Sequence, residues 1–71
     1  MEISYDKDAD ALYIEFQKGK FQRNKKIDDL TIIDLDENEQ ILGIELLAVS
    51  KRLHLNSLSE LKFKTLMSTA E

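Results

Sequence analysis

Carboxylates are the side chains of this sequence whose types and spacing most readily suggest chemistry. Acidic residues cluster at 6–10 and at 34–39, and Glu45 follows within an apolar run. Hard cations such as Mg²⁺ and Mn²⁺ prefer oxygen ligands. A carboxylate among apolar neighbours is also partly desolvated, which raises its pKa and suits it to proton transfer. A small divalent-metal or acid-assisted enzyme would therefore use Asp6, Asp10 and Glu45 as its catalytic candidates.

A structural role accounts for the same carboxylates. The stretch 34–45 resembles a calcium loop in spacing, but Glu39 stands where such a loop requires glycine, and both flanks have the pattern of strands and not of helices. Aspartate and asparagine are turn formers, so both acidic stretches fit solvated turns. Glu45 would then pair with a basic or tyrosine side chain across the sheet. On this interpretation we expect no bound metal and no cofactor.

Basic residues gather in the middle of the chain, next to Phe16 and Phe21. A basic strand with interleaved aromatic residues can follow a phosphate backbone and stack bases, which makes RNA binding an alternative. The net charge of −4 opposes nonspecific binding of nucleic acid. Charge on an edge strand also serves to discourage further strand pairing. The candidate binding residues are Lys20, Arg23, Lys25 and Lys26.

Several other classes of site are excluded by composition. The sequence has no cysteine, one histidine (His54) and two glycines, Gly19 and Gly43. Thiolate zinc sites, disulfides, a Ser-His-Asp triad and glycine-rich phosphate loops therefore have no basis. The lack of cysteine favours a reducing compartment, and the acidic start of the chain does not match a signal peptide. We expect a cytoplasmic protein without a membrane segment.

Strands and turns must position these side chains. Residues 11–16 alternate as a strand does, and 3–5 form a shorter partner across an aspartate-rich turn. Residues 17–20 predict a second turn with Gly19 at positive φ, from which 21–27 return as a polar edge strand. Segments 30–35 and 41–47 predict a further hairpin, with Asn38 as the left-handed residue of its turn.

The last part of the chain carries a helix signal. Ser57 and Glu60 match a capping box, so a helix should start at Leu58. The segment 57–67 is either all helix or ends in a strand, because residues 61–64 alternate between apolar and basic. The expectation is a single α+β domain over residues 1–71: an antiparallel β-meander of four or five strands with a short C-terminal helix against one face.

The length of the chain bears on its stability. A domain of 71 residues buries only roughly 60% of the surface that its unfolded chain exposes, and small domains compensate with disulfides, metals or self-association. With disulfides excluded, we expect a homo-oligomer, most simply a dimer that pairs through an edge strand or a second apolar face.

Three segments together resemble a known family. They are the Y-D-x-x-x-D-x-L-Y element at residues 5–13, the stretch 32–36, and the G-I-E element at 43–45. The sequence is similar here to the small prokaryotic proteins grouped as domain of unknown function number twenty-two eighty-three, over about residues 3–51. The resemblance implies no established activity. The positions that match the family's pattern are Asp6, Asp10, Gly43 and Glu45.

The charge pattern and the two-sided apolar strand at 41–47 favour a protein-interaction module that self-associates. Its acidic balance would suit a basic protein partner, such as a small toxin. The enzyme built on carboxylates and the RNA-binding strand remain as alternatives.

Overall fold

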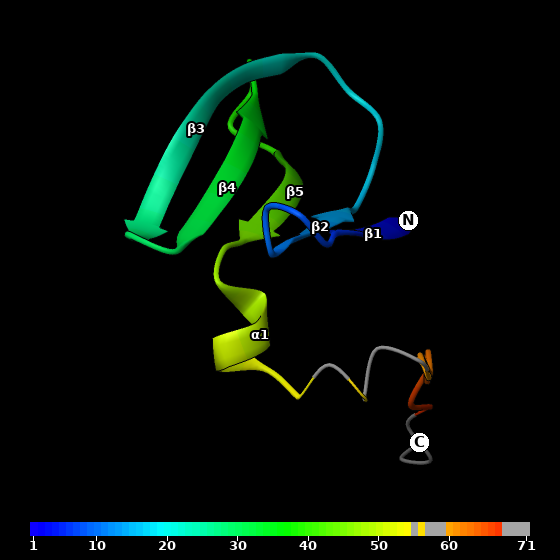
Figure 1. Ribbon diagram of the computed structural model, residues 1–71. Coiled ribbons are helices and arrows are strands. Elements are labelled where there is room, and N and C mark those ends of the chain that lie inside the picture. The colour runs from blue at the N-terminus through cyan, green and yellow to red at the C-terminus, as the bar shows by residue number, and fades with distance from the viewer. Residues whose placement is uncertain (55, 57–59, 68–71) are drawn as a thin grey trace.

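Five short strands form the body of the protein. A computed structural model describes residues 1–54, 56 and 60–67, and shows an antiparallel sheet with one short helix (Figure 1). The two predicted hairpins, at residues 3–16 and 30–47, are confirmed. Strand 21–27 is also confirmed as an exposed edge strand. The strands are β1 (Glu2–Asp6), β2 (Ala11–Glu15), β3 (Phe21–Asp28), β4 (Thr31–Asp36) and β5 (Ile41–Leu46).

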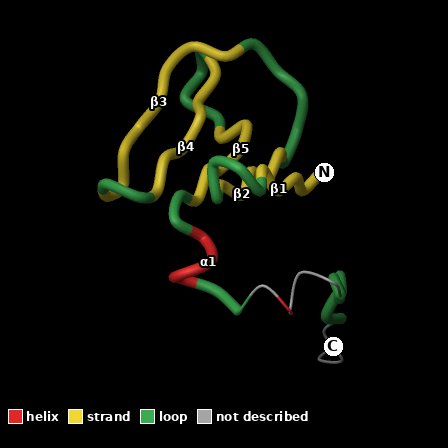
Figure 2. Tube along the Cα trace, in the orientation of Figure 1, coloured by secondary structure: helices red, strands yellow, loops and turns green. Residues whose placement is uncertain are grey.

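The order of the strands differs from the meander that we expected. The sheet runs β1-β2-β5-β4-β3, so β2 pairs with β5 and not with β3. The chain leaves β2 and crosses to the far edge of the sheet before β3 begins (Figure 2). The pairing of β2 with β5 continues into the start of this crossover, residues 16–20. There the backbone amides of Phe16 and Gln17 both donate to the carbonyl of Leu42 in β5, at 2.8 and 3.4 Å. The chain is therefore directed past the end of β5 and does not turn back beside β2.

We expected Gly19 to have a positive φ, but its role in the crossover is a different one. Neither glycine of the chain has a positive φ. A Cβ atom at Gly19 would instead lie 2.5 Å from Cδ2 of Leu42, a buried side chain of the core. Glycine thus allows the crossover to lie close against Leu42.

Alternation along the strands gives the sheet an apolar face and a polar face. On the apolar face, Leu12 lies opposite Leu46, and Ile14 opposite Ile44. The hydrophobic side chains that are buried among the described residues are few: Leu12, Leu35, Leu42 and Val49. The polar face carries Tyr13, Asp34, Gly43 and Glu45, which the register places on β2, β4 and β5.

The helix lies earlier in the chain than we expected. It is α1 (Val49–Arg52), which follows β5 directly and lies at one end of the sheet (Figure 1). Residues 60–67 form neither helix nor strand, and residues 57–59 of the expected capping box lie outside the described part of the chain. The described helix is too short to span a membrane.

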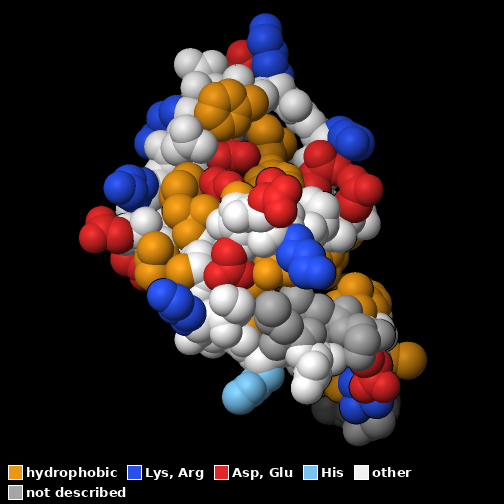
Figure 3. Space-filling view, viewed as in Figure 1, with side chains coloured by type: hydrophobic (Ala, Val, Ile, Leu, Met, Phe, Trp, Pro, Cys, Tyr) orange, Lys and Arg blue, Asp and Glu red, His pale blue; other side chains and the backbone are white. Residues whose placement is uncertain are grey.

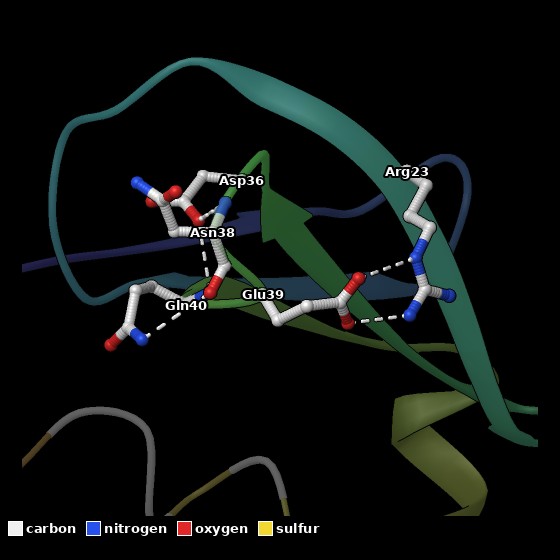
Figure 4. A network of polar contacts seen from close by, with 5 residues as sticks. All are labelled: Arg23, Asp36, Asn38, Glu39 and Gln40. Carbon is white, nitrogen blue, oxygen red and sulfur yellow. Dashed lines mark hydrogen bonds and ion pairs between the residues drawn. The ribbon is translucent and has the colours of Figure 1, made fainter.

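The turn between β4 and β5 is built from side chains of its own (Figure 4). The carboxylate of Asp36 accepts hydrogen bonds from the amides of Asn38 and Gln40, at 2.8 and 2.9 Å. The left-handed residue is Glu39, with φ 64°, and not Asn38 as predicted. Glu39 is also held from outside the turn, because Arg23 on β3 forms a two-point ion pair with its carboxylate. This pairing offsets the cost of a left-handed conformation in a residue with a Cβ atom.

Candidate functional site

A row of polar side chains crosses the polar face of the sheet. The Tyr13 hydroxyl on β2 donates to Oδ2 of Asp34 on β4, at 3.0 Å. Asn24 on β3 donates to the other carboxylate oxygen of Asp34, at 2.6 Å. The row thus joins three strands, and it passes over Gly43 on the strand between them. Both oxygens of Asp34 have a donor, so this carboxylate is well supported where it lies.

Gly43 is what allows Tyr13 to reach Asp34. A Cβ atom at residue 43 would overlap the Tyr13 hydroxyl and would lie 2.7 Å from the backbone carbonyl oxygen of Ile14. The phenol ring therefore occupies the space that a side chain at position 43 would fill. A glycine inside a strand commonly marks such a close approach.

The environment of Tyr13 determines what its hydroxyl can do. Burial, the hydrogen bond to Asp34 and the nearby negative charges of Asp34, Glu15 and Glu45 together raise the pKa of Tyr13 to about 12. A hydroxyl with this pKa keeps its proton at neutral pH. Tyr13 is thus a hydrogen-bond donor within the row, and it is a poor candidate for a base.

Asp10 joins the start of the sheet to α1. Its carboxylate accepts hydrogen bonds from the hydroxyl of Tyr5 at 2.8 Å, from the Ser50 hydroxyl at 2.7 Å and from the Ser50 amide at 3.0 Å. Its carbonyl oxygen also accepts from the amide of Val49, at 3.1 Å. The residue that precedes α1, Ala48, has no side-chain cap to offer. Asp10 therefore satisfies amides at the start of α1 that would otherwise lack a partner.

The pKa values around Asp10 agree with a structural role. The Ser50 hydroxyl, the Tyr5 hydroxyl and the Ser50 amide, with the charge of Lys51, hold the pKa of Asp10 below its ordinary value against the effect of desolvation. The hydrogen bond to Asp10 in turn raises the pKa of Tyr5. Asp10 is therefore ionised at neutral pH and Tyr5 is protonated, which is the state that their hydrogen bond requires.

The three predicted catalytic carboxylates serve different parts of the fold. Asp6 accepts hydrogen bonds from the amides of Asp8 and Ala9, at 3.0 and 3.1 Å, and so forms the turn between β1 and β2. Asp10 binds α1, whereas Glu45 lies half-buried on the polar face, opposite Tyr13. Over residues 1–54, 56 and 60–67, no three histidine, aspartate or glutamate side chains are grouped as a metal site. This arrangement lends no support to a centre built from the three carboxylates.

The predicted binding residues on and before β3 are divided between the two faces. The register places Arg23 and Lys25 opposite Leu35 and Ile33, on the apolar face, and it places Lys26 on the polar face. Arg23 is paired with Glu39, and Lys26 lies 3.9 Å from Asp29. Lys20 precedes the strand, within the crossover. Basic side chains are scattered among acidic and apolar ones on the face that Figure 3 shows. No continuous basic surface for RNA forms from these four residues.

Two features of the site were not predicted. The contact between Asp10 and Ser50 joins residues 40 positions apart, and an aspartate or a serine in the sequence does not by itself indicate such a distant partner. Two features of the sequence could have pointed to the row of Tyr13, Asp34 and Asn24. One is the glycine inside an apolar strand, and the other is that residues 13 and 43 fall on the same face once their strands pair.

Comparison with known proteins identifies the family. The model of a family described as protein of unknown function, DUF2283, matches residues 2–50. An uncharacterised protein of Methanocaldococcus jannaschii is 34% identical over 62 residues, which are 87% of this chain and 53% of that protein. The chain thus spans about half the length of this relative. No solved structure matches the chain. The family match includes all five strands, the polar row and the contact between Asp10 and Ser50, and the chain belongs to DUF2283.

Proposed function

We propose that this protein is an interaction module that associates with further copies of itself. The observation that carries the proposal is the imbalance between its core and its surface. Among the described residues, four hydrophobic side chains are buried, whereas eleven large ones are exposed. Where exposed apolar side chains gather into a large patch, they commonly mark a site of protein–protein interaction.

The alternatives have less support. The carboxylates Asp6 and Asp10 already bind backbone amides, and the basic residues of β3 are divided between two faces. A basic protein partner, such as a small toxin, stays part of the proposal, because the net charge of −4 would attract it.

The test is the oligomeric state of the full chain. Sedimentation velocity and light scattering from micromolar to millimolar concentration should show a mass that rises from 8.2 kDa to twice this value. A constant monomer mass over this range would contradict the proposal. Light scattering of the full chain mixed with a small basic protein would then test the second kind of partner.

A further inference from the structure

The segment after α1 exposes apolar side chains with a strand-like spacing. Leu61, Phe63, Leu66 and Met67 are 75%, 85%, 86% and 85% exposed. Leu61 and Phe63 alternate with Lys62 and Lys64, so in an extended conformation they would present two apolar side chains on one face and two ammonium groups on the other. Such a segment gains from pairing with a sheet edge, where its apolar side chains would leave water.

The edge of the sheet at β1 has the matching pattern. Its inner side pairs with β2, and its outer side has no strand partner among the described residues. Ile3 and Tyr5 are half-buried on the apolar face, whereas Glu2 and Ser4 are exposed on the polar face. A strand added here would meet apolar neighbours on one face and polar or acidic ones on the other.

We infer that residues 61–64 of one copy add to β1 of a second copy as an antiparallel strand, an inference that rests on the self-association proposed above. The register pairs residue 61 with residue 5, and residue 64 with residue 2. Leu61 and Phe63 then extend the apolar face beside Tyr5 and Ile3. Lys62 and Lys64 lie beside Ser4 and Glu2 on the polar face. Exchange in both directions gives a two-fold symmetric dimer in which the two contacts are identical.

Charge at β1 supports this choice of edge. Glu2 lies directly opposite Glu15, a like-charge pair that destabilises a sheet. Glu15 has an ion pair with Lys18, at 3.1 Å, whereas Glu2 has none among the described residues. Lys64 of a second copy would supply the missing countercharge for Glu2. The other edge, β3, carries Arg23, Lys25 and Lys26 and would repel the same segment.

The structure favours a second copy over the same copy as the source of this strand. Residues 60–67 lie apart from β1 of their own chain (Figure 1), and their apolar side chains contact little of it. Phe63 is so exposed that its replacement should leave the fold of one copy unchanged. This separates an effect on assembly from an effect on folding.

The test uses charge reversal in the full chain, with the dimer dissociation constant measured by sedimentation. Lys62→Glu with Lys64→Glu should weaken the dimer about tenfold or more, as should Glu2→Lys with Ser4→Lys. The chain that carries all four changes should recover the affinity, because it pairs opposite charges again. Phe63→Ser should weaken the dimer too. Lys20→Glu with Lys25→Glu changes the net charge by the same amount as the first pair, and Ile27→Ser removes an exposed apolar side chain of β3. Both controls should leave the dimer intact.

The outcomes separate this inference from the function on which it rests. If the chain dimerises but the variants at residues 62–64 do not change the dissociation constant, the strand exchange is wrong and self-association stands. Loss of the dimer in Ile27→Ser would place the contact at β3 and overturn the inference as well. If the chain stays monomeric, both fail. Slow hydrogen exchange of the amides 61–64 in that monomer would show that the segment pairs within its own chain.

Discussion

Gly43→Ala is the substitution that best tests the arrangement of the polar face. The added methyl group would overlap the Tyr13 hydroxyl and would approach the Ile14 carbonyl oxygen to 2.7 Å. The ring of Tyr13 can move only by giving up its hydrogen bond to Asp34, while the Ile14 carbonyl belongs to the backbone of β2 and has little freedom. We therefore expect the sheet to lose stability and the polar row to open.

The magnitude follows from these two contacts. A hydrogen bond to a charged group contributes about 1.5–3 kcal/mol to stability, and overpacking a well-filled site costs about 1–3 kcal/mol. The two effects overlap, because the displaced ring relieves part of the clash, so we expect a loss of about 2–4 kcal/mol. A domain of this size has a free energy of unfolding of roughly 4–10 kcal/mol. The loss is therefore a substantial part of the stability of the fold.

Urea unfolding followed by circular dichroism measures this loss, and Tyr13→Phe provides the matched control. Without the hydroxyl, the nearest atom to the new methyl group is gone, so Gly43→Ala should cost at least about 1 kcal/mol less in the Tyr13→Phe background. The reasoning would be refuted if Gly43→Ala lost less than about 1 kcal/mol on its own, or if the two substitutions were simply additive.

Three further predictions concern the pKa values and the turns. Because the pKa of Tyr13 rises from 10.0 to about 12 on folding, its contribution to the free energy of unfolding should be constant below pH 10.0 and be lost as the pH rises toward 12. Urea titrations at alkaline pH should show this loss in the unchanged chain and not in Tyr13→Phe. Because the pKa of Asp10 is lowered on folding, its contribution should be present above its ordinary pKa of 3.8 and be lost as the pH falls through the folded value. Asp10→Asn should abolish this loss and speed hydrogen exchange at the Ser50 amide, while Asp8→Asn, which removes an exposed carboxylate of the same turn, should do neither. Glu39→Gly in an Arg23→Gln background should raise the free energy of unfolding by about 1 kcal/mol, because it relieves a left-handed residue whose ion pair is already gone. A decrease in stability there would show that the conformation of Glu39 carries no strain.

The strands were predictable because their signals are local. Alternation at residues 11–16 and the aspartates of the turns indicate their elements without reference to the rest of the chain. The strand order was not predictable in this way, since it depends on the pairing of β2 with β5, which includes a hydrogen bond from the Phe16 amide to the Leu42 carbonyl, 26 positions away. Gly19 is a residue type typical of turns, but its role is to let the crossover lie close against Leu42, which only the position of Leu42 in the fold reveals.

In the site, too, the local roles of residues could be predicted and their distant contacts could not. Asp6 was recognisable as a turn residue, and it is one. Asp10 carries the same local signal, but its second role as the cap of α1 depends on a residue 40 positions later. The helix itself was missed because four residues give no periodicity to detect, and its cap comes from a distant part of the chain.

The crossover that places β5 between β2 and β4 has a consequence for the order of folding. The strands β3, β4 and β5 follow one another through short turns and can pair early, as can β1 and β2, at little cost in loop entropy. These two units are joined only when β2 pairs with β5, which are separated in sequence by the crossover, β3 and β4. Until that step β2 and β5 each present an open edge, so their pairing should limit the rate of folding and be the stage at which the chain is most prone to pair with the wrong strand.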